Sequence, residues 1–494
     1  MRIERLAFVA LPLLLTACAV GPNYRRPQAN IPPQWTAPAT TGTRLGAEPP
    51  DERWWKSFHD AELESLIERA AAANYDVRIS LARLEEARAA SGIAKSALYP
   101  QVSAGVSAER IRQIGVGLAS SQNPGSVHPQ IFPYETNYYQ GSFDASWELD
   151  VFGRIRRQVE AARADVRASD EDRRNVLISV FGDVGRYYAG LRGDQLRLEI
   201  ATKNVSVAED ELKLTRDLAQ AGQVTHRDVA QAEAQLESVQ AQIPQLNAAI
   251  EVSIHRLSVL TGQQPGALDS ELRVASPLPV VPPDVPVGLP SDLLTRRPDI
   301  RSANAQLAAA TARVGIAKAD YFPTFTLFGS AGRQAAQLHD LTLGLGNFFA
   351  AGPSVSVPVF TGGRIRSNVA LQSARVKEAG ALYQKTVLTS LEETENALTG
   401  YAEEQSRRDH LEATVRASQE ALDLTNAQYR AGLTDFLTVL DSERTLFENQ
   451  DLLAQSQTAL ATDLVTLYKA LGGGWAPEAR NLTAKSQSEG GTKQ

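Results

Sequence analysis

The stretch TRDLAQAGQVTHRDVAQAEAQLESVQAQIPQLNAAIEVSIHRL, from Thr215 to Leu257, returns as TNAQYRAGLTDFLTVLDSERTLFENQDLLAQSQTALATDLVTL from Thr425 to Leu467. In both copies an apolar residue stands at every seventh position, in the first copy from Val229 to Leu257. A helix of 3.6 residues per turn drifts off such a stripe unless it supercoils, so the stripe predicts left-handed coiled-coil helices. An ordinary amphipathic helix of a soluble bundle is the alternative interpretation.

Composition argues against several classes of function. The 494 residues carry 57 acidic and 50 basic side chains, a formal charge of −7. Because the two signs are mixed throughout, there is no basic face for nucleic acid. The six histidines are scattered and Met1 is the only methionine, so no metal site and no cofactor is expected. The sequence contains no GxSxG, HExxH, P-loop or cysteine-histidine arrangement, so we do not expect an enzyme.

The N-terminus has the pattern of an exported lipoprotein. Two arginines precede an apolar run from Leu6 to Leu15, which predicts a signal peptide at 1–17. The run is too short to span a bilayer. Leu15-Thr16-Ala17-Cys18 resembles a bacterial lipobox, and it predicts lipidation of Cys18, a palmitate-type anchor, with Ala19 directing the chain to the outer membrane. A cysteine placed there by chance is the alternative.

Two segments alternate with the period of a strand rather than of a helix. After Pro100, apolar and polar residues alternate to Glu109, and a polar loop is expected over Arg112–Asn137. The segment 139–151 alternates again, with apolar and aromatic residues on one side and polar or acidic ones on the other. Such a length suits a strand between lipid and a wet lumen. The apolar side consists of Tyr139, Gly141, Phe143, Ala145, Trp147, Leu149 and Val151.

The whole arrangement is duplicated. Gly92-Ile93-Ala94-Lys95 returns as Gly315-Ile316-Ala317-Lys318, and Gly153-Arg154-Ile155-Arg156 returns as Gly363-Arg364-Ile365-Arg366. The order expected is a signal peptide at 1–17, a lipidated extended segment at 18–60, a helix at 61–98, two strands at 99–152, a long helical hairpin at 153–262, a linker at 263–289, a helix at 290–321, two strands at 322–362, a second long hairpin at 363–471 and a tail at 472–494.

The hairpins are expected to be unusually long. No proline interrupts Gly153 to Ala221, which as one helix would extend roughly 100 Å. Gly222 and Gly432 stand where each hairpin reverses, since glycine suits the left-handed stop of a helix. Pro244 predicts a kink in the first returning helix.

Four strands cannot close a barrel in lipid, where an open edge would leave backbone groups without partners. Two copies would make eight strands with a filled interior, and three would make twelve strands around water. Because the polar sides carry Gln, Ser, Asp and Glu, we expect a homotrimer and a twelve-stranded barrel in outer membrane lipid.

Several motifs together resemble the TolC-like outer membrane factors, and among them the NodT-type efflux lipoproteins. They cover nearly the whole mature chain: CAVGPNY at 18–24, WWKSF at 54–58, RPDIR at 297–301, YRAGLTDFLTVLD at 429–441 and YKALGGGW at 468–475. The resemblance implies a mixed α and β fold, a trimeric β-barrel continued by a coiled-coil α-barrel. It also implies a periplasmic membrane-fusion adaptor and an inner-membrane transporter, of the proton-driven RND type, as partners.

The resemblance also suggests site residues. Gly222 and Gly432 would form the periplasmic tips that meet the adaptor. Asp441 matches an acidic ring at the closed aperture, with Asp435, Arg430 and Tyr429 near the same constriction. The alternative is that the glycines only end helices and that Asp441 is a solvated residue at the flank of a coiled coil.

The resulting hypothesis is a passive exit channel of a tripartite efflux pump, of the kind that confers multidrug resistance. Two alternatives stay open. One is a channel for exported protein or oligosaccharide, and the other is an outer membrane lipoprotein that serves as a non-conducting scaffold.

Overall fold

The computed structural model describes residues 19–36, 43–44, 52–120, 127–282, 285–342 and 346–474. The expected signal peptide, Cys18 and the tail from 475 onward lie outside the described residues. The described chain forms two compact units. One contains residues 85–167 and 305–381 with the N-terminal residues to Arg26, and the other contains 27–84, 168–304 and the chain from Leu382.

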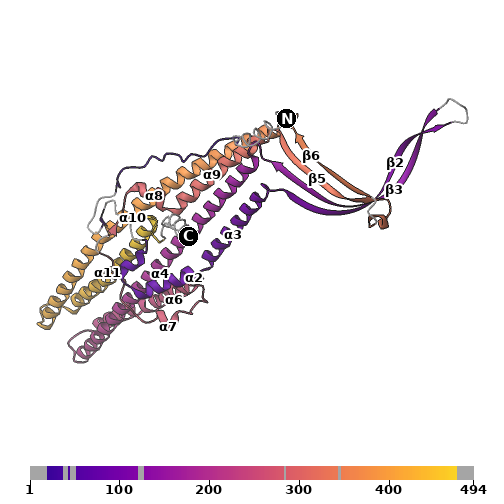
Figure 1. Ribbon diagram of the computed structural model, residues 1–494. Coiled ribbons are helices and arrows are strands. Elements are labelled where there is room, and N and C mark those ends of the chain that lie inside the picture. Colours follow the sequence, from indigo (N-terminus) through magenta and orange to yellow (C-terminus); the bar gives the residue numbers. More distant parts are fainter. Residues whose placement is uncertain are drawn as a thin grey trace, which may run out of the picture. The chain divides into compact units, whose positions relative to one another are not determined.

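The first unit contains one antiparallel sheet of four strands in the order β2-β3-β5-β6 (Figure 1). Their bounds are β2 Gln101–Ser120, β3 Val127–Leu149, β5 Thr324–Ala335 and β6 Asn347–Ser356. Trp147 lies opposite Leu327, and Phe325 opposite Val355, so the expected apolar positions of both repeats share one face. The shared side-chain direction fits a fold built by duplication, because a slip of one residue would turn every side chain over.

The prediction of a polar loop over Arg112–Asn137 is wrong for residues 112–120 and 127–137, which belong to β2 and β3. β2 and β3 stay paired from Gln101 opposite Ser146 to Ser120 opposite Val127. The sequence keeps its period of two there, with Ile114, Val116 and Leu118 at alternate positions. The polar and glycine residues of this segment suggested a loop. The segment can nevertheless form a strand, because the hydrogen bonds of an antiparallel ladder are made by the backbone. In the second repeat the pairing ends sooner, at Arg333 opposite Asn347.

The long helices continue directly from the strands. β3 leads into α4, Arg154–Gln220, and β6 leads into α10, Arg364–Arg430, each 67 residues long. The second hairpin returns through one helix, α11 Phe436–Ala470. The first returns through two, α5 His226–Gln240 and α6 Gln242–Leu260. The division at Ala241 follows from Pro244, whose ring nitrogen has no hydrogen to donate to the carbonyl of Gln240.

The segment expected as one helix at 61–98 contains α2 Ala61–Ala73 and α3 Tyr75–Ser96. Asn74 separates them, because its side-chain oxygen accepts from the backbone of Asp76 at 2.8 Å and of Val77 at 3.2 Å. Its amide also donates to the carbonyl of Leu260 at 2.9 Å. The repeat mate of α3 is α9, Pro298–Ala319. The shorter elements are β1 Thr43–Arg44, η2 Trp54–Phe58, α7 Asp269–Leu272, β4 Val285–Pro286, η3 Pro290–Asp292, α8 Leu293–Arg296 and η4 Leu338–Leu341.

The second unit has two apolar centres. In one, the buried ring of Trp54 stacks on Tyr468 with centroids 5.6 Å apart and meets Trp55 edge to face. The other, here called the tip core, joins α4, α5, α10 and α11 near the ends of both hairpins. It consists of Leu212, Ala232, Leu422, Phe436, Val439, Leu440 and Leu446, with Val229, Leu236, Val415 and Tyr429 packed against it. Within the described part of the chain, no helix is both long and apolar enough to cross a membrane.

Candidate channel surfaces and helical tips

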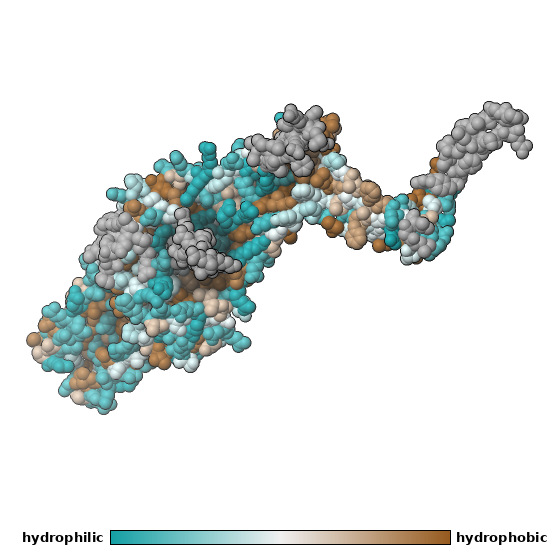
Figure 2. Space-filling model, viewed as in Figure 1, coloured by the Kyte–Doolittle hydropathy of each residue, from teal (hydrophilic) through white to brown (hydrophobic). Residues whose placement is uncertain are grey.

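One face of the sheet leaves apolar side chains uncovered. Val106 is 87% exposed, Phe143 67% and Phe349 86%. Apolar residues are also visible along the sheet in the space-filling view (Figure 2). Trp147 is partly buried, and its Nε1 donates to the carbonyl of Leu98 at 3.0 Å. Soluble chains seldom expose contiguous apolar surface of this kind, so the face is suited to contact with lipid.

The opposite face carries polar groups that bond along the strand. Gln140 donates to the hydroxyl of Ser142 at 3.3 Å, and Ser142 donates to the carboxylate of Asp144 at 2.9 Å. Near the helix, the guanidinium of Arg154 holds the carboxylate of Glu148 at 2.5 and 3.1 Å. Such a face is suited to water, so the two faces of the sheet separate an apolar from an aqueous environment.

Each long hairpin reverses at a glycine with left-handed backbone. Gly222 has φ 71° and Gly432 has φ 70°. The amide of Leu433 donates to the carbonyl of Gln428 at 2.9 Å, and the amide of Gln223 bonds in the same way to Leu218. These six-to-one bonds satisfy carbonyls that a helix end leaves free. A side-chain Cβ at either glycine would meet nothing within 4 Å, so no other described part of the chain covers either glycine.

Asp435 begins α11 as its N-cap. Its carboxylate accepts from the Thr438 amide at 3.0 Å and from the Thr438 hydroxyl at 2.6 Å. These hydrogen bonds lower the pKa of Asp435. The structure therefore gives Asp435 a capping role, which the sequence motif did not suggest, while its side chain remains exposed.

The other three predicted aperture residues lie near the same end of the unit in different surroundings. Asp441 is 67% exposed and pairs with Arg444 at 3.0 Å, one turn along α11. Tyr429 packs on Phe436, centroids 5.7 Å apart, at the edge of the tip core. Arg430 is exposed at the last position of α10. Within this described chain, no hydrogen bond or ion pair joins any two of these side chains to each other or to Asp435.

Comparison with known proteins assigns the family. Residues 66–263 and 289–473 match the family described as outer membrane efflux protein. The chain belongs to this family. The resemblance noted in the motifs is thereby confirmed, and so is the location in the outer membrane.

The relatives of this efflux protein align over their whole length. Nodulation protein T of Rhizobium leguminosarum bv. trifolii is 30% identical over 480 residues, which cover 97% of this chain and 99% of that protein. The toluene efflux pump outer membrane protein TtgC of Pseudomonas putida is 30% identical over 488 residues, 98% of each chain.

Solved channels share its fold. The outer-membrane channel OprN superimposes with a TM-score of 0.84 at 36% identity, covering 93% of this chain and all of that one. The open state of the MtrE outer membrane channel of Neisseria gonorrhoeae superimposes with a TM-score of 0.77 at 27% identity, covering 92% and 98%. The predicted fold class is confirmed, with four strands per chain continued by long helical hairpins.

The structure of this efflux protein also contains a feature that sequence reasoning missed, a pair of carboxyl groups inside the second unit. Glu443 of α11 is 2% exposed and lies close to Glu211 of α4, and one oxygen of each carboxyl group is buried without a hydrogen-bond partner in the described structure. Burial, together with the neighbouring acid, raises the pKa of Glu443 to about 10, and burial raises that of Glu211. The sequence repeat showed that Glu443 aligns with Glu233. It did not show that Glu443 lies beside Glu211, 232 positions earlier in the chain.

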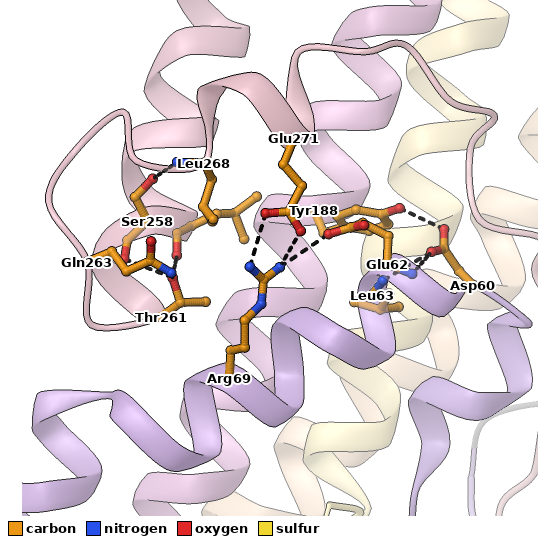
Figure 3. A network of polar contacts seen from close by, with 11 residues as sticks. Asp60, Glu62, Leu63, Arg69, Tyr188, Ser258, Thr261, Gln263, Leu268 and Glu271 are labelled. Atoms are coloured by element: carbon orange, nitrogen blue, oxygen red, sulfur yellow. Dashed lines mark hydrogen bonds and ion pairs between the residues drawn. The ribbon is translucent and has the colours of Figure 1, made fainter.

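A second polar cluster fastens α2 to α7 (Figure 3). Arg69 donates to both carboxylate oxygens of Glu271, at 3.0 and 2.7 Å, and to Glu62 at 3.3 Å. Burial of its carboxyl group, and to a smaller extent the neighbouring Glu271, raise the pKa of Glu62 to about 7. Beside it, Tyr188 donates to Asp60, the N-cap of α2, at 2.8 Å. These contacts join α2 to α7 and to α4.

Proposed function

We propose that this efflux protein is the passive exit channel of a tripartite efflux pump, docked to a periplasmic membrane-fusion adaptor and an inner-membrane RND-type transporter. The observation that carries the proposal is the division of the sheet into an uncovered apolar face and a polar face bonded along its strands. A wall of this kind belongs between lipid and water, and the strands lead directly into 67-residue helices. Energy for transport would come from the inner-membrane transporter.

The proposed channel is a homotrimer. In the described sheet, β2 pairs on one side with β3, and β6 on one side with β5, so each has a free edge. Free edges are not tolerated in lipid, because their backbone groups would have no partner. Joining β6 of one copy to β2 of the next removes every edge, and three copies give the twelve strands that a water-filled passage needs.

The anchor and the docking surface follow from the same proposal. Lipidation of Cys18 would attach the N-terminus to the outer membrane, with the helices in the periplasm. The open turns at Gly222 and Gly432 are the proposed contacts for the adaptor. Nodulation, toluene efflux and pyoverdine export appear in the names of relatives 30 to 31% identical to this chain. We therefore assign the choice of cargo to the transporter rather than to this duct.

Asp441 is the proposed acidic residue of the aperture, with Tyr429, Arg430 and Asp435 beside it. Its repeat mate is Gln231, so each chain contributes one carboxylate and the trimer three. A ring of like charges attracts cations and disfavours anions.

Deletion of the gene tests the proposal. An efflux channel predicts increased susceptibility to, and retention of, substrates of the partner transporter, restored by the intact gene. A scaffold without a passage predicts unchanged retention. A defect confined to secreted protein or surface oligosaccharide would favour the export alternative.

A further inference from the structure

Glu211 and Glu443 are not accounted for by any part of the proposed channel. They face each other between α4 and α11 beside the tip core. One oxygen of each carboxyl group, Oε2, is buried and has no hydrogen-bond partner in the described structure. Two ionised carboxylates would be strongly unfavourable here, because burial removes water and each charge repels the other.

The internal duplication provides a comparison for Glu443. Its repeat mate, Glu233, is 50% exposed and bonds to the guanidinium of Arg216. In the second repeat the position of Arg216 is occupied by Asn426. Glu443 therefore has no arginine at the position that pairs with Glu233 in the first repeat. Its neighbour is instead a second acid, Glu211.

The other charged groups around the pair do not replace that cation. Lys203 of α4 lines the same groove as Glu443, a groove of about 590 Å³, but its ammonium is exposed and paired with Glu199 at 2.6 Å. Asp423 of α10 lines this groove too, and Tyr429 of α10 is an uncharged phenol near Glu211. Asp228 of α5 is bonded to its capping partner Thr225, and on α11 itself Asp441 is paired with Arg444. The pKa shift of Glu443 arises from burial and from Glu211.

We propose that a proton shared by Glu211 and Glu443 holds α11 against α4, and that separation of these helices releases it, so that separation is favoured as pH rises. The effect on conduction rests on the proposed function, because α11 also carries Asp441. In the packed state Glu443 donates to Glu211. In the separated state water solvates both groups, and the proton leaves to bulk solvent.

The sign follows from linkage. In the packed state the pKa of Glu443 lies near 10, and in water it returns toward its ordinary value of 4.5. Between these values the packed state binds more protons than the separated state. Packing is therefore fully stabilised at low pH and weakens with increasing pH, by up to tenfold in the equilibrium for each pH unit and proton released.

Two measurements on full-length trimers test the inference between about pH 5 and about pH 9. One is hydrogen exchange of the 436–450 segment, corrected for intrinsic exchange, and the other is single-channel open probability in planar bilayers. We expect both to rise with pH in the unmodified protein. Glu443→Gln keeps a donor to Glu211 but cannot release a proton, so it should flatten both slopes. Glu233→Gln, the exposed repeat mate, should leave both slopes unchanged.

Equal slopes in the unmodified protein and in Glu443→Gln would overturn the inference, as would a flat exchange profile in the unmodified protein. If folded trimers carry no current at any pH while hydrogen exchange of the 436–450 segment still rises with pH, the result would contradict the proposed channel function but support the proton shared by Glu211 and Glu443. If Glu443→Gln does not assemble, Glu211→Gln must reduce the exchange slope, because the buried Glu443 still titrates there but no longer beside a second acid.

Discussion

Three carboxyl groups near the start of α11 have different roles because their surroundings differ. Asp435 caps the helix through Thr438, Asp441 is solvated and paired with Arg444, and Glu443 is buried against another acid. Of the three, only Asp441 has an exposed carboxylate that caps no helix, which suits the aperture role proposed for it. At residue scale, burial and hydrogen-bond partners rather than residue type separate a structural carboxylate from a candidate gate.

Asp441→Ala should raise the conductance of reconstituted trimers and reduce their preference for cations. The substitution removes three charges from the proposed aperture and the pairing with Arg444. Single-channel recording with a salt gradient measures both effects. Gln231→Ala, at the uncharged repeat mate, is the control and should leave selectivity as it was. Unchanged current through correctly folded Asp441→Ala trimers would remove this residue from the gate.

Arg297→Ala should lower the stability of the chain substantially. The guanidinium is 8% exposed and donates to Asp299, to Glu393 at 2.6 Å and to the carbonyl of Ala470 at 3.0 Å. Its removal leaves the carbonyl of Ala470 without that donor and two partly exposed carboxylates without their cation, which costs about 1–3 kcal/mol.

Thermal unfolding of purified trimers measures this loss. Arg444→Ala breaks only exposed ion pairs, with Asp441 and with Glu448, and should shift the midpoint little. Equal midpoints for the two variants would show that the Arg297 contacts contribute little to stability.

At the scale of elements, breaks in the helices have local causes. Pro244 divides the first returning helix at Ala241, and Asn74 separates α2 from α3 by capping the second. In the second repeat, where position 454 is alanine instead of proline, α11 runs unbroken. The glycines at the tips are needed for their left-handed backbone and not for lack of space, because a Cβ there would meet nothing within 4 Å.

Gly432→Ala should destabilise the second hairpin by about 1 kcal/mol, since a side chain in left-handed backbone is strained. No neighbouring atom adds to this cost, because a Cβ there meets nothing within 4 Å. Gly400→Ala, in the interior of α10 with equally open space, should have the opposite sign, because alanine is the better helix former. Chemical or thermal unfolding of the two variants compares them. A loss at Gly400 as large as at Gly432 would contradict the backbone explanation.

At the scale of the whole molecule, the duplication predicts how copies join. β3 pairs with β5 across the two repeats, with Ala145 opposite Gly329. The repeat mate of Ala145 is Val355, and that of Gly329 is Val106. Val355 of β6 should therefore lie opposite Val106 of β2 in the next copy. Both side chains are largely uncovered in the single chain, 55% and 87% exposed.

Cysteines at Val355 and Val106 should form a disulfide between copies and give a covalent trimer on a denaturing gel after oxidation. The sequence has a single cysteine, Cys18, which the proposed lipidation blocks. Cysteines at Val355 and Val102 are the control, four residues out of register and too far apart to bridge. Covalent species no larger than a dimer would favour closure by two copies, and equal yields from the two pairs would contradict the register.

The sequence by itself determined the periodic features of this protein, because a repeat of two or seven residues reports the face of a strand or helix directly. Alternation at 139–151, the heptads after Gly222 and Gly432, and the duplication together predicted the strands and the hairpins. The family was suggested separately, by the resemblance of several short motifs to known proteins. Tertiary structure alone decided what depends on residues far apart in the chain. The meeting of Glu211 with Glu443 and the bonds of Arg297 are of this kind. Neither burial nor a partner's identity has a local period, so no spacing in the sequence could have revealed them.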